Sequence, residues 1–141
     1  MNFVLDASVA LAWFLDMDSE ATDYAAGVRR LILNSRAVCV VPGNWHLEVG
    51  SGLIRAHRNH RLGFTAAKLA DALEVIDDIP VWTHHLGMES RHVVDLAKAY
   101  NLTGYDAQYF HLALTEGLPI ASLDKGIQSS CKVFGVELLK P

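Results

Sequence analysis

The chain has 141 residues, of which 51% are hydrophobic and 20% are charged. This composition suits one globular domain with a single core, and it excludes a disordered tail. The net charge of −4 gives no global basic field of the kind that favours nucleic acid.

Three further features of the sequence concern the cellular compartment. No apolar run has the length needed to span a bilayer, so we expect no membrane association. The first residues carry Asp6 and no basic segment, and we expect structure there rather than a signal peptide. Cys39 and Cys131 lie far apart with no motif around either, so we expect buried, reduced thiols in a cytoplasmic protein.

Apolar spacing predicts strands that alternate with helices along the whole chain. The short apolar or β-branched runs that predict strands are 2–5, 37–41, 81–83, 120–123 and 136–139. The segments with helical spacing are 7–15, 19–35, 44–57, 64–77, 87–100, 102–117 and 125–133, with Ser19 as the expected N-cap of the second. Alternation of this kind predicts a parallel sheet with right-handed crossovers. We therefore expect an α/β fold, a single-domain α/β/α sandwich with a central, mainly parallel sheet.

Four carboxylates stand out by their positions. Asp6 ends the first predicted strand, and Glu48 lies in the helix after the second. Asp106 begins the helix before the fourth strand, and Asp124 ends that strand. Because ligands of parallel sheets gather beyond the carboxyl ends of the strands, we expect Asp6, Asp106 and Asp124 at one edge, where Glu48 can lean in from a neighbouring helix. Each acid also has a structural explanation, as a helix cap, a partner of a helix dipole or a solvated residue.

A cluster of acids has chemical consequences. Neighbouring carboxylates repel one another and raise each other's pKa, and a hard cation relieves that repulsion. Oxygen donors favour Mg²⁺ or Mn²⁺, and one or two such ions can support phosphodiester hydrolysis. Ser8 and Ser122 each lie two residues from an acid. Their hydroxyls could hold a metal-bound water or a phosphate oxygen, or they could be ordinary small residues near strand ends.

A basic cluster follows the third predicted helix. It consists of Arg55, His57, Arg58, His60 and Arg61. It is either a solvated helix end or, through its arginines, a phosphate-contacting patch for RNA. Lys125, beside Asp124, is a further candidate RNA contact. The two histidines have a spacing that zinc could use, but no third ligand is near them in the sequence.

Other aromatic and histidine residues favour structural roles. We expect Trp13, Trp45 and Trp82 in the core rather than as base-stacking platforms. His111 lies in an apolar helix and is expected to be a hydrogen-bonded core residue. His84 and His85 follow the third strand, and we expect them on the surface.

With these residues identified, the chain resembles the PIN-domain family, in particular the VapC-type toxin ribonucleases of bacterial toxin–antitoxin pairs. The matching segments are VLDASVALAWFLD, VPGNWHLEV, LTGYDAQYFHLALTEGLPIASLDKGI and the closing GVELL. The resemblance implies a metal-dependent endoribonuclease in which Asp6, Glu48, Asp106 and Asp124 bind the metal and Ser8 or Ser122 assists. It also implies a cognate antitoxin, whose tail lies in a groove that reaches the acids, and a homodimer.

The sequence departs from the family pattern at two places. Many relatives have Asn three residues after the glutamate, where this chain has Ser51, so that hydrogen bond is expected to be shorter or mediated by water. Gly43 and Asn44 replace a more apolar pair.

Two other functions stay open. One is a catalytically inert interaction module with the same fold. The other is an aspartyl-nucleophile phosphatase, which needs a second Asp where this chain has Ser8.

Overall fold

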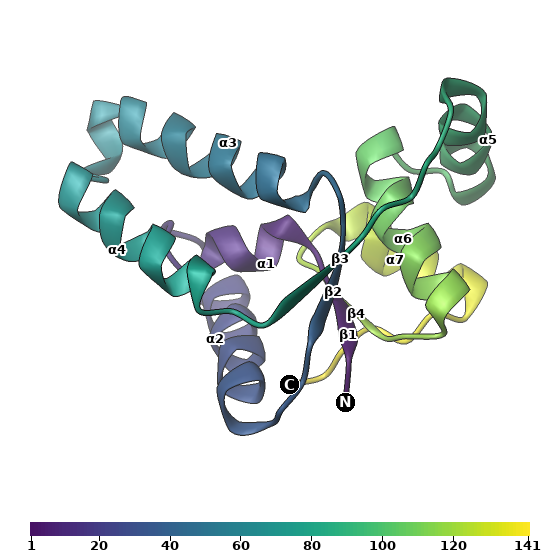
Figure 1. Cartoon of the computed structure of the whole chain (residues 1–141), viewed down its shortest axis with the longest axis horizontal. Helices are drawn as coiled ribbons and strands as arrows, with labels where there is room; N and C mark the ends of the chain where they lie inside the picture. The colour runs from purple at the N-terminus through teal and green to yellow at the C-terminus, as the bar shows by residue number, and fades with distance from the viewer.

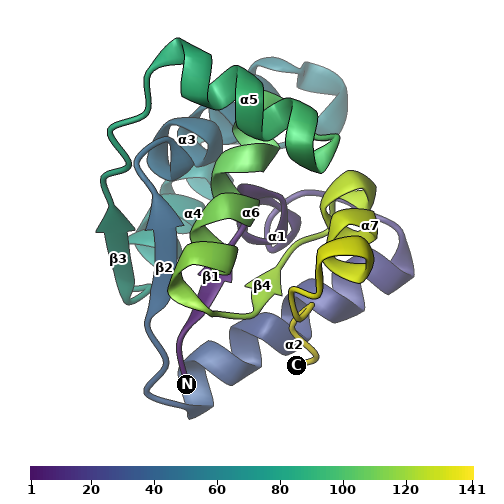
Figure 2. The same ribbon diagram turned by 90° about the vertical axis from the view of Figure 1, so that its right-hand side faces the viewer.

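The computed structural model describes residues 1–141, and it is built around a four-stranded sheet. The strands are β1 (Phe3–Leu5), β2 (Cys39–Pro42), β3 (Val81–His84) and β4 (Ile120–Ala121), in the order β3-β2-β1-β4. Every pairing is parallel, with Val4 opposite both Val40 and Ile120. Figure 2 shows the strand arrowheads pointing toward one edge of the sheet, as the sequence predicts.

Helices cover both faces of this sheet. They are α1 (Ala7–Ala12), α2 (Ser19–Asn34), α3 (Trp45–Arg58), α4 (Ala66–Asp77), α5 (Ser90–Tyr100), α6 (Gly104–Glu116) and α7 (Lys125–Phe134), with a short 3-10 turn at His60–Leu62. Figure 1 views the sheet nearly edge-on, with α1 to α4 on one side and α5 to α7 on the other. The predicted α/β fold is confirmed, and all its strand pairs are parallel.

The core explains why β1, β2 and β4 are apolar throughout. Every residue of these three strands is buried, as expected for strands with helices on both faces. Trp45, Tyr109 and Phe110 are the largest side chains of this core and come from the helices on either side. Besides the cysteines and aromatic residues, only three polar residues are buried: Asp6, Ser122 and Ser130. Two of these belong to the acidic site.

The last predicted strand, at 136–139, is wrong. The structure has only an isolated parallel bridge there, between Ile120 and Leu138. Two hydrogen bonds support it: Ile120 N–H donates to the carbonyl of Glu137 at 2.9 Å, and Leu139 N–H donates to that of Ile120 at 2.8 Å. Because β4 has only two residues, it offers too short an edge for a second full strand.

Several single-residue predictions also need correction. The N-cap of α2 is Asp18 rather than Ser19, since the Asp18 side chain accepts the N–H of Ala21 at 2.9 Å. Trp82 is 52% exposed, because β3 is an edge strand and Trp82 lies on the side that faces away from the core. His111 is only partly buried, and its Nδ1 has no hydrogen-bond partner.

Other expectations have mixed outcomes. Trp45 is fully buried, whereas Trp13 is partly buried and donates its Nε1–H to the carbonyl of Ala25 at 2.8 Å. His85 is exposed, but His84 is partly buried and lies 3.4 Å from Glu116.

Both cysteines are free and buried, as predicted. None of the helices combines the length and the apolar character that crossing a membrane would require.

Candidate functional site

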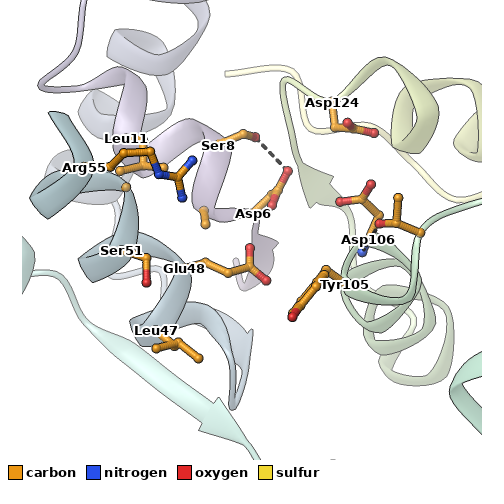
Figure 3. A pocket seen from close by; sticks show the side chains of 13 residues that line it. Asp6, Ser8, Leu11, Leu47, Glu48, Ser51, Arg55, Tyr105, Asp106 and Asp124 are labelled. Carbon is orange, nitrogen blue, oxygen red and sulfur yellow. Dashed lines mark hydrogen bonds between the residues drawn. The ribbon is translucent and has the colours of Figure 1, made fainter. Parts of the chain in front are cut away.

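The four acids singled out in the sequence line one pocket of about 590 Å³. The pocket lies beyond the carboxyl ends of the strands. Asp6 follows β1, Glu48 reaches in from α3, and Asp106 lies in the first turn of α6. Asp124 precedes α7 and completes the set. Figure 3 shows the four carboxyl groups around the same space, although the chain places them up to 118 positions apart.

Asp6 is held by two serine hydroxyls. Ser8 and Ser122 both donate from Oγ to Asp6 Oδ2, each at 2.7 Å. Asp6 occupies the N-cap position of α1, but its side chain makes no capping hydrogen bond. It is 4% exposed, and burial raises the pKa of its carboxyl. The serine hydroxyls oppose that rise, and the charge of Asp124 adds to it. Asp6 thus stands at the start of α1, and its side-chain hydrogen bonds are to the two serine hydroxyls.

The two serines are themselves oriented by the backbone. Ser8 Oγ accepts the N–H of Leu123 at 3.1 Å, and Ser122 Oγ accepts the N–H of Asp124 at 3.0 Å. Both hydroxyl protons are thereby directed to Asp6. Ser122 is completely buried and does not line the pocket, so its predicted contact with water or phosphate is wrong and it acts through Asp6. Ser8 does line the pocket.

Glu48 is fixed at both of its oxygens. Tyr109 donates its hydroxyl to Oε2 at 3.1 Å, and the Asn44 side-chain amide donates to Oε1. Burial raises the pKa of Glu48, and the charges of Asp6 and Asp106 raise it further. Burial and the neighbouring charge of Glu48 also raise the pKa of Tyr109, so its hydroxyl remains a donor.

The two departures from the family pattern meet at this glutamate. Ser51 lines the pocket but makes no hydrogen bond to Glu48 in the structure. Asn44, from the preceding turn, supplies the amide contact instead. The direct side-chain partners of Glu48 are therefore Asn44 and Tyr109.

Asp106 and Asp124 lie on the α6 and α7 side. The N–H of Asp106 donates to Thr103 Oγ1 at 3.2 Å, which makes Thr103 the cap of α6 and leaves the Asp106 carboxyl to the pocket. Burial raises the pKa of Asp106, and the charge of Asp124 raises it further. Asp124 caps α7, since its Oδ1 accepts the N–H of Ile127 at 2.8 Å. Asp124 therefore has the structural role considered from the sequence and also lines the pocket.

The donor set can be tested against a divalent cation. No three His, Cys, Asp or Glu side chains approach closely enough to share one ion directly. The pocket nevertheless presents only oxygen ligands from four carboxylates, and the sole ion pair of the molecule joins His84 to Glu116 elsewhere. Mg²⁺ keeps several waters and binds through one or two carboxylates. The oxygen donors of Asp6, Glu48, Asp106 and Asp124 would therefore suit a divalent cation that keeps part of its water shell.

The basic residues divide between several places. Arg55 lines the acidic pocket from α3, whereas Arg58 and Arg61 are exposed outside it. Lys125 borders a separate hollow beside Tyr100 and Phe134.

The two histidines of the basic cluster, His57 and His60, do not form a zinc site. His57 Nδ1 lies 2.8 Å from the carbonyl oxygen of Phe64, and His60 is exposed in the 3-10 turn.

Sequence reasoning missed several residues of the pocket. It also missed the hydrogen bond from the core residue Tyr109 to Glu48, although the spacing of three from Asp106 places Tyr109 on the same side of α6. The missed lining residues are Tyr105, Leu47 and Leu11. No local motif marks them, because their position depends on how α1, α3 and α6 come together.

Comparison with known proteins supports the fold. No family model and no curated protein matches this chain. Among solved structures, it is similar to one described as the crystal structure of PAE2754 from Pyrobaculum aerophilum. The two chains share 20% sequence identity and superpose with a TM-score of 0.63, over 92% of this chain and 79% of the other. At this identity the similarity establishes the α/β architecture alone.

Proposed function

We propose that this protein is a Mg²⁺- or Mn²⁺-dependent endoribonuclease of the PIN type, the toxin component of a type II toxin–antitoxin pair. The observation that carries the proposal is the gathering of Asp6, Glu48, Asp106 and Asp124 in one pocket. Burial raises the pKa of three of these carboxyls, Asp6, Glu48 and Asp106, and the charges of neighbouring acids raise each of them further. That arrangement is costly without a counter-charge, and a cation would relieve it.

The chain's own residues would prepare this site for a phosphodiester. Ser8 and Ser122 hold Asp6 in one orientation, and Tyr109 and Asn44 hold Glu48. Such support keeps ligands in place before a metal arrives. When bound, the ion would stabilise negative charge on the phosphate and lower the pKa of a coordinated water. The reaction adds water across the phosphorus–oxygen bond, so one product gains the hydroxyl and the other gains the proton.

One observation favours the inert interaction module instead. No three potential ligands converge on a single point, and an inert module needs no such convergence. The aspartyl phosphatase gains no support, since Ser8 donates a hydrogen bond to Asp6 and Asp6 is almost completely buried.

The decisive experiment is cleavage of a mixed RNA pool by purified protein in EDTA, Mg²⁺ or Mn²⁺. The Asp106→Asn variant removes one pocket carboxylate. Asp95→Asn, at an exposed position on α5, is the matched control. We expect cleavage that requires metal, survives Asp95→Asn and is lost with Asp106→Asn.

Metal titration distinguishes the remaining outcomes. An active Asp106→Asn variant, or cleavage in EDTA, refutes the proposed chemistry. If neither cleavage nor carboxylate-dependent Mn²⁺ binding is found, the inert module is correct. The proposed toxin role also requires a cognate antitoxin that suppresses the activity. The homodimer that the family resemblance implies can be measured by sedimentation.

A further inference from the structure

Two exposed apolar side chains flank the acidic pocket and have no role in holding a metal. Tyr105 on α6 is 64% exposed, and Leu47 on α3 is 70% exposed. Both line the pocket, and Figure 3 shows them on either side of its opening, next to Asp106 and Glu48. Exposed apolar groups concentrated at a polar site commonly mark a ligand surface. An aromatic face next to a reaction site can stack with a planar ring.

Arg55 adds a positive charge to the same pocket. It lies one helical turn beyond Ser51 and points toward the pocket in Figure 3. Despite four carboxylates in this pocket, Arg55 makes no ion pair, since the molecule has only the pair between His84 and Glu116. Its guanidinium is thus free to bind an oxyanion, and arginine is well suited to phosphate.

We propose that this pocket binds an unpaired RNA nucleotide, with its base stacked on Tyr105 and a neighbouring phosphate held by Arg55. This inference rests on the proposed nuclease function and assigns the two residues that hold a base and a phosphate of its RNA substrate. Because Tyr105 and the four acids line the same pocket, a base on its ring lies beside the acids. In a duplex the base is already stacked between its neighbours, so it cannot stack on Tyr105 unless it is first extruded.

Binding can be measured separately from cleavage. The proteins carry Asp106→Asn so that the RNA stays intact, and Mg²⁺ is present throughout. The probe is a short, random-sequence, fluorescein-labelled RNA, and fluorescence anisotropy gives its affinity. Stacking of one base predicts that Tyr105→Ala weakens binding roughly 5- to 150-fold, while Tyr105→Phe keeps the ring and the affinity. Trp82→Ala is the matched control, because Trp82 is also exposed but lies outside the pocket.

A salt titration tests the phosphate contact. For single strands, each phosphate contact contributes about 0.7 to the slope of log affinity against log salt concentration. Arg55→Met is therefore expected to reduce the slope by about 0.7. Arg36→Met is expected to leave it unchanged, since Arg36 is exposed just before β2, near the opposite edge of the sheet.

The outcomes separate this inference from the proposed function. Loss of affinity at Tyr105 and Arg55, with weaker binding of the annealed duplex, supports the subsite even if no RNA is ever cut. Unchanged affinity of Tyr105→Ala, equal affinity for duplex, or no saturable binding overturns it. Metal-dependent cleavage alongside any of these three results leaves the nuclease intact and removes only the subsite.

Discussion

Removal of one hydroxyl, by Tyr109→Phe, tests how Glu48 is held. Tyr109 is completely buried and donates to Glu48 Oε2 at 3.1 Å. Phe keeps the ring in the core, so the substitution deletes the hydrogen bond with little change in packing. A hydrogen bond to a charged group contributes about 1.5–3 kcal/mol, and one between neutral groups about 0.5–1.5 kcal/mol.

The pH dependence follows from the chemistry of the acceptor. The Tyr109 bond lowers the pKa of Glu48, so it stabilises the ionised carboxylate more than the neutral acid. We therefore expect Tyr109→Phe to lower the free energy of unfolding by about 1.5–3 kcal/mol where Glu48 is ionised. The loss should shrink to about 0.5–1.5 kcal/mol once the carboxyl is protonated. For a chain of this size, the larger loss corresponds to a melting temperature lower by roughly 5–10 °C.

Urea and thermal unfolding in EDTA, across a pH series, measure this directly. Tyr105→Phe is the matched control. It removes the same hydroxyl group, but from an exposed tyrosine whose hydroxyl makes no hydrogen bond within the protein. A Tyr109→Phe variant as stable as the wild type, or one whose loss is the same at all pH values, refutes the reasoning. If the proposed metal site is correct, Mn²⁺ affinity measured by calorimetry also falls about 10- to 100-fold.

Three further predictions concern the acids and the serines that support them. Asp6→Asn should stabilise the metal-free protein at neutral pH by on the order of 1 kcal/mol or more in urea unfolding, because the fold raises the pKa of that carboxyl and so disfavours its ionised form. The wild-type carboxyl regains that stability as the pH falls toward 3.8, so a gain that grows on acidification would contradict the assignment. Ser122→Ala should cost about 1–3 kcal/mol, since it leaves the N–H of Asp124 without its acceptor, whereas Ser129→Ala at an exposed position should be neutral in the same assay. Asp124→Asn should keep the N-cap of α7 and the stability of the protein but lose Mn²⁺ affinity. Asp124→Ala should lose the affinity and also lower the free energy of unfolding by about 1 kcal/mol. If Asp124→Asn binds Mn²⁺ as well as the wild type does, Asp124 has a capping role alone.

The architecture could be predicted from the sequence because hydrophobic spacing and the glycine and proline residues that end helices act locally. Gly117 ends α6 in the left-handed conformation at a φ of 63°, and Pro119 follows it. The strand-end rule then brings Asp6 and Asp124 to one edge without any knowledge of side-chain contacts. The first turn of α6 places Asp106 at the same edge, whereas the reach of Glu48 from α3 depends on how that helix packs.

The remaining errors arise where tertiary packing decides. A run of three or four residues such as 81–84 does not reveal that its strand lies at the edge of the sheet, and so Trp82 was wrongly assigned to the core. The hydrogen bond from Tyr109 to Glu48 joins α6 to α3 across 61 positions of the chain. Lys125 adjoins Asp124, yet it borders another hollow because the first turn of α7 rotates it away from the acids.

The hydrogen bond between Asp6 and Ser122 also has a consequence for protein synthesis. Its two residues are 116 positions apart, so a nascent chain cannot form the bond until β4 has left the ribosome. At roughly 5–20 residues per second, translation adds Ser122 roughly 6–23 s after Asp6. During that interval the first carboxylate lacks one of the two hydroxyls that later hold it, and Asp106 and Asp124 are absent for most of the time. The acidic pocket is therefore among the last parts of the molecule to be completed, and an incomplete chain released early would not contain it.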